Sequence, residues 1–286
     1  MTTGYLLAVL TGVLFGVQGA YGKAISKYFD APFLAWANFA FTVPFVLFLL
    51  FLSPIPEVDW VSFVWSTMIS FMVNLIAWIL FFRALSLSPL YLTMPFTALT
   101  PLFTIPIAFF LLGELPDFRG VIGILLIIAG VYSIQAERES LIAPFIHLFK
   151  EKGTRLMLIV AVIWSLSATV EKVAVQSSSP QFYAVTIHLL LAVAYFPYVY
   201  RKHPGKMKQM TDKLLWLIML GAISGTLAIC QFTALKYLDV SYVIAFKRAG
   251  VMLSVFLGFV FFGEKRILLH LLATGLIISG ALMIMF

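Results

Sequence analysis

The sequence predicts an all-α integral membrane protein with ten transmembrane helices, and three observations support this class. Hydrophobic residues make up 62% of the 286 residues and charged residues only 11%, whereas a soluble domain carries about 25% charged residues. The apolar residues fall into ten runs of about 20 residues, the length that crosses a bilayer. These runs are continuously apolar instead of alternating, which excludes a transmembrane β-barrel. The composition also excludes soluble enzymes and nucleic-acid-binding proteins.

Gly, Pro and charged residues bound the ten apolar runs. The first run follows a short N-terminus without basic residues and has no cleavage signal, so we expect it to be retained as the first span. Several prolines lie inside runs, which membrane helices tolerate because neighbouring helices satisfy the freed carbonyls. The predicted spans are 4–24, 32–52, 61–82, 90–111, 118–135, 155–175, 181–200, 214–236, 240–262 and 267–285.

The basic residues are distributed unevenly between the two sides of the membrane. The even-numbered connections between spans hold only three of the 19 Lys and Arg residues, namely Arg119, Lys172 and Lys236. Apart from one pair inside a span, the others lie in the odd-numbered connections. The positive-inside rule therefore places the odd-numbered connections in the cytoplasm and both termini outside. We expect a multi-pass protein of the cell (inner) membrane.

The chain repeats itself at an offset of about 150 residues. Near the start of each half, Phe15 and Lys23 match Trp164 and Lys172. Three further pairs of segments match: 82–85 (FRAL) with 232–235 (FTAL), 112–114 (LGE) with 262–264 (FGE), and 129–130 (AG) with 279–280 (SG).

Each repeat contains five spans, and because five is odd the two repeats must be inverted in the membrane. We expect a first repeat at 1–136, a linker at 137–153 and a second repeat at 154–286. The linker has apolar residues on one helical face, which predicts a short amphipathic helix on the cytoplasmic interface. Inverted repeats are typical of secondary transporters, although gene duplication leaves repeats in other membrane proteins too.

These matched segments resemble the drug/metabolite transporter superfamily, and within it the ten-helix EamA-type proteins. The resemblance covers the whole chain and implies a transporter, but the superfamily handles amino acids, drugs, sugars, nucleotide sugars and phosphorylated metabolites. Its small multidrug members carry a Glu eight residues before the Lys of the first helix. Here those positions hold Phe15 and Trp164, which disfavours proton-coupled export of cationic drugs.

Lys247 and Arg248 lie well inside the ninth span and are the main candidates for a substrate site. A cation at the bilayer centre costs about 2.5–3.5 kcal/mol on insertion scales, so an intramembrane pair indicates function. Arg can bind a carboxylate or phosphate through a bidentate fork, and Lys acts as a point charge. The alternative is that one of them reaches the interface or pairs with Glu171 or Asp239 for structural reasons.

The resemblance adds that phosphate translocators of this superfamily carry a Lys-Arg pair in helix 9 that contacts substrate phosphate, and Lys247 and Arg248 match it. Those translocators use another Lys in their first half. This chain has no Lys between Lys27 and Lys150, which disfavours a doubly charged phosphate ester.

We expect Lys247 and Arg248 to face a cavity between the fourth and ninth helices. The fourth helix contains three prolines and the ninth none, so a bending fourth helix would gate a site on a straight ninth helix. His188 is expected to be structural. The candidate neutral neighbours of the cations are Gln18, Asn74, Thr97, Thr100 and Tyr242, and the candidate gating or structural residues are Pro95, Pro101, Glu114 and Glu264.

The sequence therefore predicts a secondary transporter that moves a small organic metabolite with an anionic group by alternating access. The alternatives are a generic amino-acid or drug exporter of the same superfamily and a flippase for a lipid-linked phosphate. No catalytic, cofactor or metal motif is present, so a membrane enzyme is disfavoured. We place no acidic residue near the membrane centre and expect exchange or facilitated movement instead of proton antiport. The expected partners are the solute and the bilayer, with no nucleic acid, in a monomer or homodimer.

Overall fold

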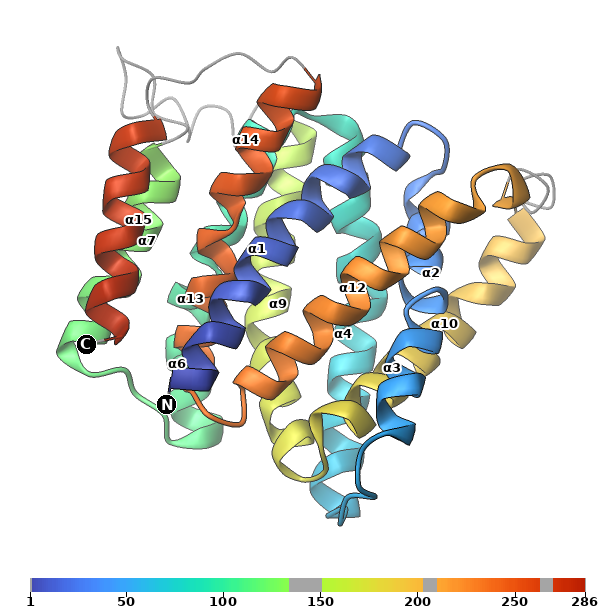
Figure 1. Ribbon diagram of the computed structural model, residues 1–286, viewed down its shortest axis with the longest axis horizontal. Helices are drawn as coiled ribbons and strands as arrows, with labels where there is room; N and C mark the ends of the chain where they lie inside the picture. Colours follow the sequence, from blue (N-terminus) through green and yellow to red (C-terminus); the bar gives the residue numbers. More distant parts are fainter. Residues whose placement is uncertain (1, 134–150, 203–209, 263–269, 286) are drawn as a thin grey trace.

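The computed structural model describes residues 2–133, 151–202, 210–262 and 270–285. Every element in these ranges is helical, which confirms the predicted all-α class (Figure 1). Eight helical segments are long and apolar enough to cross a membrane, and the fifth helix of each repeat is a shorter apolar helix. The described ranges therefore hold the ten predicted spans, with ends that differ from the prediction by a few residues.

The first repeat contains five spans, two of which are broken. The second span consists of two helices, and the fourth is divided into three pieces with a 3₁₀ helix in the middle. The elements are α1 (Thr2–Ile25), α2 (Ala31–Ala40), α3 (Val43–Phe51), α4 (Trp60–Leu87), α5 (Leu90–Thr93), η1 (Met94–Leu99), α6 (Thr100–Leu112) and α7 (Phe118–Ser133).

The second repeat has the same order of spans, and its ninth span is also broken. The elements are α9 (Lys152–Gln176), α10 (Pro180–Lys202), α12 (Leu214–Ala234), α13 (Val240–Ala249), α14 (Val251–Phe262) and α15 (His270–Met285). α9 begins at Lys152, within the last two residues of the linker that we expected at 137–153. The interfacial helix that we expected there falls almost entirely outside the described residues, as does Glu264.

Prolines account for the breaks in the first repeat. Pro44 lies in the first turn of α3, Pro95 in the first turn of η1 and Pro101 in the first turn of α6. Proline has no N–H to donate to the preceding turn, so a new helical segment begins there. Gly113 then ends α6 in the left-handed conformation, with φ of +69°, which glycine adopts without steric cost.

The ninth span differs from the straight helix that its lack of proline predicted. It divides into α13 and α14 at Gly250, where it crosses α1 at Gly12. A Cβ atom added to Gly250 would overlap the carbonyl group of Gly12. The two backbones can approach this closely only because both residues are glycine, as is common where membrane helices pack.

The two repeats are inverted in the structure. Gly4, at the start of α1, packs against Leu238, and Lys172, near the end of α9, donates a hydrogen bond to the carbonyl oxygen of Leu238 at 2.8 Å. The start of α1 therefore lies beside the end of α9. Gly153, at the start of α9, packs against Ser88 at the opposite end of the molecule, so the first helices of the two repeats run antiparallel.

A pair of equivalent hydrogen bonds reflects the same inversion. Lys23 of α1 donates to the carbonyl oxygen of Ser88 at 3.0 Å, and Lys172 of α9 donates to that of Leu238 at 2.8 Å. In addition, the Tyr5 hydroxyl near the start of the chain donates to the carbonyl oxygen of Ile284 near its end, at 3.1 Å. Both described ends of the chain therefore lie on one side, as an even number of crossings requires.

The helices pack across the two repeats more than within them. The third helix of one repeat packs along the first helix of the other, as α4 does on α9 and α12 on α1. The two fifth helices, α7 and α15, pack against each other at one edge of the molecule (Figure 1). Their contact runs through Gly123 and Gly280, where a Cβ atom added to either would overlap the backbone carbonyl of the other.

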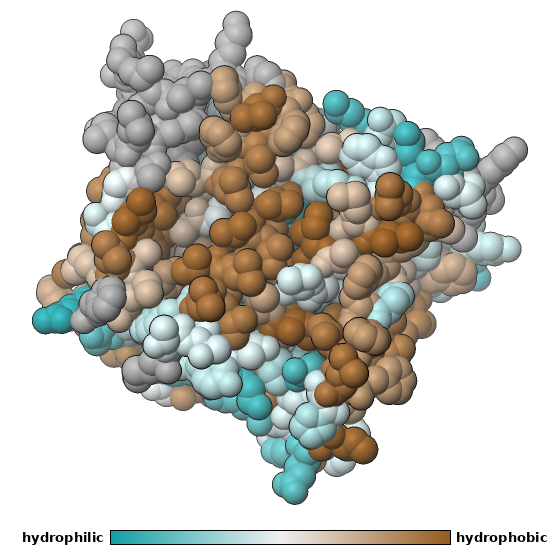
Figure 2. Space-filling model, in the orientation of Figure 1, coloured by the Kyte–Doolittle hydropathy of each residue, from teal (hydrophilic) through white to brown (hydrophobic). Residues whose placement is uncertain are grey.

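The surface is apolar where a soluble protein would be polar. Large side chains such as Phe51 and Phe110 are 78% and 83% exposed. Figure 2 shows a broad hydrophobic band across the middle of one face, with hydrophilic residues gathered toward its edges. Exposed apolar surface on this scale marks contact with lipid or a partner, and the length of the helices identifies lipid.

Candidate functional site

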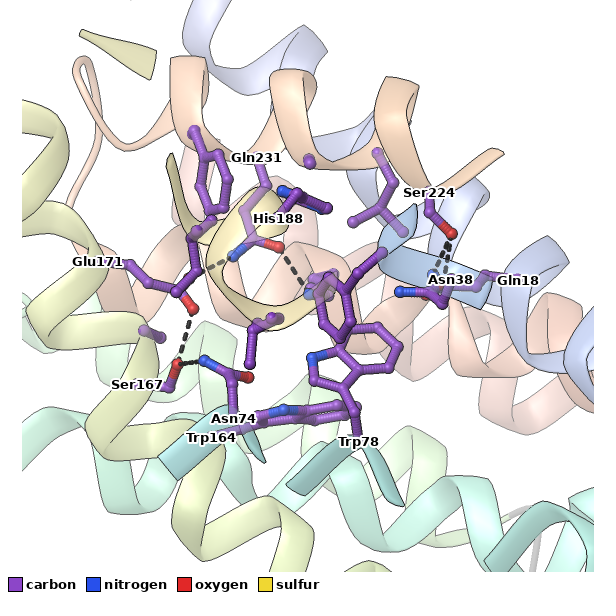
Figure 3. A pocket seen from close by; sticks show the side chains of 18 of the residues that line it. Gln18, Asn38, Asn74, Trp78, Trp164, Ser167, Glu171, His188, Ser224 and Gln231 are labelled. Carbon is purple, nitrogen blue, oxygen red and sulfur yellow. Dashed lines mark hydrogen bonds between the residues drawn. The ribbon is translucent and has the colours of Figure 1, made fainter. Parts of the chain in front are cut away.

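A polar cavity lies inside the helix bundle, between the two repeats. Residues of α1, α2, α4, α9, α10, α12 and α13 line it, and Figure 3 shows their side chains converging on it. Its volume is about 60 Å³, enough for roughly four to six water molecules. At this volume the cavity has room for a metabolite only after the helices move.

Lys247 and Arg248 both line this cavity. They lie in the last turn of α13, just before the break at Gly250, and their side chains are 8% and 1% exposed. Neither side chain therefore reaches lipid or the aqueous interface.

Two aromatic rings enclose the cations. The guanidinium carbon of Arg248 lies 4.7 Å from the ring centre of Phe15 and 5.0 Å from that of Trp164. The Lys247 ammonium lies 5.1 Å and 5.7 Å from the same two centres. Phe15 and Trp164 occupy equivalent positions in the two repeats, where the small multidrug proteins carry Glu. Cation–π attraction partly replaces the charge that a carboxylate would have supplied there.

A chain of hydrogen bonds links Lys247 to an acidic residue. The Lys247 ammonium donates to Gln231 Oε1 at 2.6 Å, and Gln231 Nε2 donates to Glu171 Oε2 at 3.1 Å. The Ser167 hydroxyl donates to Glu171 Oε1 at 2.7 Å, and Asn74 Nδ2 donates to Ser167 Oγ at 2.6 Å. Four helices, α4, α9, α12 and α13, contribute to this chain.

Glu171 corrects the expectation that no carboxylate lies near the membrane centre, because it lines the cavity together with both cations. The sequence placed it near the membrane boundary because it is adjacent to Lys172. In the structure α9 runs to Gln176, one residue beyond the predicted span, and Glu171 lies five residues or about 7.5 Å before the end of this helix.

Arg248 is the least satisfied of the charged groups in the cavity. Its Nε and Nη1 atoms are buried and have no hydrogen-bond partner among the described residues. A buried donor without a partner costs about 1–3 kcal/mol, and more when it is charged. A guanidinium with unpaired donors can bind a carboxylate or phosphate group through charge-assisted hydrogen bonds.

A neutral polar cluster lies at the other end of the cavity, beyond Trp78 and Trp164 (Figure 3). Gln18 Nε2 donates to Asn38 Oδ1 at 3.1 Å and to Ser224 Oγ at 2.8 Å, and the Ser224 hydroxyl donates to Asn38 Oδ1 at 2.6 Å. Gln18 Oε1 is buried and has no partner in the part of the chain that the structure describes. This cluster therefore has one free acceptor.

His188 also lines the cavity, although the sequence suggested only a structural role. Its Nδ1 lies 2.7 Å from the carbonyl oxygen of Ala184, which fixes the ring orientation on α10. The ring lies 5.3 Å from that of Phe39. His188 and Phe39 thus form part of an aromatic wall.

Three of the predicted neighbours lie elsewhere. The Thr97 and Thr100 hydroxyls donate to the carbonyl oxygens of Met94 and Thr97, both at 2.7 Å, because threonine readily satisfies carbonyls of its own turn. The Tyr242 hydroxyl donates to Asp117 Oδ1 at 3.0 Å. Tyr242 precedes Lys247 by five residues, which corresponds to about 140° around a helix, so the two side chains point to different sides.

The predicted position of the cavity between the fourth and ninth helices is therefore wrong. The fourth span, Leu90–Leu112, packs on the ninth, but the residues that line the cavity with Lys247 and Arg248 come from the other spans named above. Gln18 and Asn74 do line it, at opposite ends of the cavity (Figure 3). The break of the fourth span at Pro95 and Pro101 is real, and its gating role stays a prediction.

An ion pair joins the two repeats at one end of the molecule. Glu114, in the segment between α6 and α7, pairs with Lys172 of α9, and its Oε2 accepts from the backbone N–H of Val240 at 3.0 Å. Glu114 thus caps α13 in the other repeat, where a carboxylate favours the positive helix end. Lys172 pairs with Glu114 and not with Glu171. Burial and the charge of Glu114 raise the pKa of the neighbouring Asp239, while Lys172 opposes that shift.

Comparisons with known proteins agree on the type of molecule. The model of the EamA-like transporter family matches residues 2–135 and 151–286. A protein of Archaeoglobus fulgidus described as an "Uncharacterized transporter" is 32% identical over 143 residues, which is 48% of this chain and 48% of that protein. The match thus spans about half the length of the curated relative. A solved structure described as "Crystal structure of protein" superimposes with a TM-score of 0.72 at 18% identity, over 99% of this chain and 96% of that one, so the two share a fold.

Proposed function

The chain belongs to the EamA-like transporter family and is thus a membrane transporter of the drug/metabolite transporter superfamily, and on that premise we propose that it moves a small organic metabolite with an anionic group by alternating access. Family membership points to a transporter and not to an enzyme.

The single observation that supports an anionic solute is the burial of Arg248 with unpaired hydrogen-bond donors. Its guanidinium lines the cavity at 1% exposure, with Nε and Nη1 unpaired among the described residues. A charged group in such a place is strongly destabilising unless water or a counter-ion reaches it. An arriving carboxylate or phosphate group would supply a hydrogen-bond acceptor for the guanidinium and the opposite charge.

Alternating access is supported by the inverted repeats and by the small volume of the cavity between them. In inverted-repeat transporters the substrate site lies at the interface of the repeats, near the membrane centre. The cavity occupies that interface, and its 60 Å³ volume holds water only. Opening on the side of Glu114 requires that the Glu114–Lys172 pair separates, since it ties the first repeat to α9 and α13 of the second.

We place the Glu114 side outside the cell and the opposite side in the cytoplasm, as the distribution of basic residues predicts. On this assignment the protein is a multi-pass protein of the cell membrane with both termini outside. The closed pair would then seal the outer side.

A generic exporter of neutral solutes is the second candidate, and one feature favours it. The Gln18, Asn38 and Ser224 cluster offers uncharged hydrogen bonds at one end of the cavity, and Trp78 and Trp164 form an apolar wall between the two polar ends. A solute without charge would use this end alone.

The experiment is uptake of a panel of radiolabelled metabolites into liposomes that contain the purified protein. We expect uptake of anionic solutes, driven by their own gradient or by exchange. Uptake restricted to neutral amino acids or cationic drugs would contradict the proposal and favour the generic exporter. Movement of a lipid-linked phosphate would favour a flippase.

The same liposomes test coupling, for which our expectation of exchange or facilitated movement has lost its original reason now that Glu171 lines the cavity. If uptake is driven by a pH gradient alone and Glu171→Gln abolishes that drive, proton coupling operates. If the variant retains uptake driven by the solute gradient, exchange or facilitated movement stands.

A further inference from the structure

We propose that the cavity binds a solute with a single negative charge, and that Glu171 sets this limit by neutralising one of the two cations. The inference rests on the proposed function and narrows its substrate class from anions in general to monoanions. Glu171 is thus assigned as a specificity-determining residue.

The first step is the orientation of the Gln231 amide. A lysine ammonium can only donate hydrogen bonds, so the atom of Gln231 that lies 2.6 Å from Lys247 must be the oxygen. The Gln231 nitrogen then faces Glu171 as a donor, at 3.1 Å. The orientation of this amide follows from the chemistry of its two neighbours.

The second step is the protonation of Glu171. Asn74 donates to the Ser167 oxygen at 2.6 Å, which leaves the Ser167 hydroxyl hydrogen for Glu171 Oε1 at 2.7 Å. Gln231 donates to the other carboxylate oxygen. Donors at both carboxylate oxygens favour the ionised form of Glu171.

The third step is the charge balance of the cavity. Lys247, Arg248 and Glu171 are the residues with a formal charge among those that line it, and together they carry one net positive charge. Glu171 is linked to Lys247 by the two hydrogen bonds that Gln231 makes, so we pair its negative charge with Lys247. Arg248 keeps its two unpaired donors, so the uncompensated charge lies on the residue with free hydrogen bonds.

A solute with one negative charge neutralises the net positive charge of the cavity, whereas a dianion or a zwitterion does not. A dianion would bring a second negative charge into a site with one net positive charge, where low dielectric makes an excess charge costly. A zwitterion brings no net charge and would leave the net positive charge of the cavity uncompensated. The cavity thus favours a monoanion over both.

The aromatic residues restrict how the anion can approach. The rings of Phe15 and Trp164 lie next to the guanidinium carbon of Arg248, so the anion must approach the edge that bears the N–H groups. Trp78 lies 5.4 Å from Trp164, ring centre to ring centre, and Phe39 lies 5.4 Å from Trp78. These rings offer flat apolar surface to the body of the solute, which makes a benzoate-like monoanion a suitable probe.

The test is binding of three matched probes to the purified full-length protein, measured as the concentration dependence of the thermal shift. Benzoate is the monoanion, terephthalate the dianion and benzamide the neutral analogue of the same shape. We expect benzoate to bind the wild-type protein more tightly than either of the others. Equal or tighter binding of terephthalate would overturn the inference, as would absence of benzoate binding.

Glu171→Gln supplies the decisive variant. It raises the net charge of the cavity by one, so the affinity for terephthalate relative to benzoate should rise by roughly tenfold or more, as expected for one charge at short range in low dielectric. Glu171→Asp keeps the charge and should keep the preference for benzoate. An unchanged preference in Glu171→Gln would overturn the inference.

Lys247→Gln keeps the inference testable if Glu171→Gln does not fold. It lowers the net charge of the cavity to zero, so benzoate should lose its advantage over benzamide, and a retained advantage would count against the inference. The proposed function fails separately, in the liposome assay. If anions of all charges are transported and terephthalate binds as well as benzoate, the function stands and the monoanion limit falls.

Discussion

At the scale of single residues, the two adjacent cations of the cavity differ in their hydrogen-bond partners. Lys247 has a hydrogen-bond acceptor in Gln231, whereas Arg248 has rings beside its guanidinium and no partner for Nε or Nη1 among the described residues. The aromatic contacts reduce the cost of holding Arg248 in place without using its hydrogen bonds. Those donors are therefore left for a ligand.

Arg248→Lys should weaken binding of the transported anion although it preserves the charge. Lysine cannot form the planar fork with two parallel hydrogen bonds, and a lost hydrogen bond to a charged group costs about 1.5–3 kcal/mol, or roughly tenfold or more in affinity. The measurement is the dissociation constant of benzoate, or of whichever anion the liposome panel identifies. An affinity within a factor of two of wild type would show that charge alone, without the fork, holds the ligand.

The sequence could identify some cavity residues and not others, for physical reasons. Lys247 and Arg248 were visible because a charge inside an apolar run has few structural explanations. Glu171 was missed because its neighbour Lys172 suggested a helix end. Thr97 and Tyr242 were wrongly included, since the 3₁₀ segment and the angle around α13 decide where they point, and neither can be read from hydropathy.

At the scale of helices, the crossing of α1 with the ninth span is the tightest contact between the repeats. Gly12 and Gly250 meet backbone to backbone, and the ninth span changes from α13 to α14 there. The crossing lies two residues after Arg248. The position of the guanidinium therefore depends on this packing.

Gly250→Ala should destabilise the protein by about 1–3 kcal/mol, the usual cost of overpacking, because the new methyl group would overlap the Gly12 carbonyl. Gly275→Ala is the matched control, since a Cβ atom added at Gly275 of α15 meets nothing within 4 Å. Thermal unfolding in detergent compares the two. If both variants unfold at the wild-type temperature, the crossing tolerates a side chain and our account of the break is wrong.

The Glu114–Lys172 pair should act as a closure on one side of the cavity. Glu114→Gln removes the charge that holds Lys172 and weakens the cap on Val240, so we expect the side that bears Glu114 to open more often. The readout is the rate at which a membrane-impermeant maleimide labels Ala168→Cys, which lines the cavity, in a Cys230→Ser background. The reagent is applied to intact cells.

The control for this experiment is Glu57→Gln, which removes an exposed carboxylate from the loop between the second and third spans. That loop lies on the same side, because the backbone N–H of Asp59 donates to the carbonyl oxygen of Ser177 just after α9. Labelling should rise in Glu114→Gln and stay at the parent rate in Glu57→Gln. Equal labelling rates in the parent, Glu114→Gln and Glu57→Gln would show that the Glu114–Lys172 pair does not close the cavity.

The spans themselves were largely predictable, and their internal breaks were not. Hydropathy locates all ten spans because the bilayer fixes their length. The break at Pro95 and Pro101 follows from local chemistry, so the sequence indicated it. The break at Gly250 depends on Gly12, which is distant in sequence, and a straight helix was therefore predicted.

At the scale of the whole molecule, inversion follows from the repeat and from counting spans. The structure adds the contacts that carry it: Lys23 and Lys172 donate to equivalent carbonyls at opposite ends, and α4 on α9 mirrors α12 on α1. A site that lies between such halves can be exposed to either side by similar movements.

The orientation in the membrane is tested by a pair of cysteines in the Cys230→Ser background. Glu57→Cys should be labelled by an impermeant maleimide in intact cells, because we assign that loop to the outside. Arg201→Cys, near the end of α10, should be labelled only after permeabilisation. The reverse pattern would invert the assignment and place the Glu114 closure in the cytoplasm.

The central claim is that the buried cations bind the anionic group of the solute that the protein moves. Solute counterflow in liposomes, compared between the wild-type protein and the Lys247→Ala, Arg248→Ala double variant, tests it most directly. We predict that the wild-type protein exchanges anionic solutes, and that the folded double variant loses this exchange, because no other cation among the described residues lines the cavity. Undiminished anion exchange by the double variant would contradict the account.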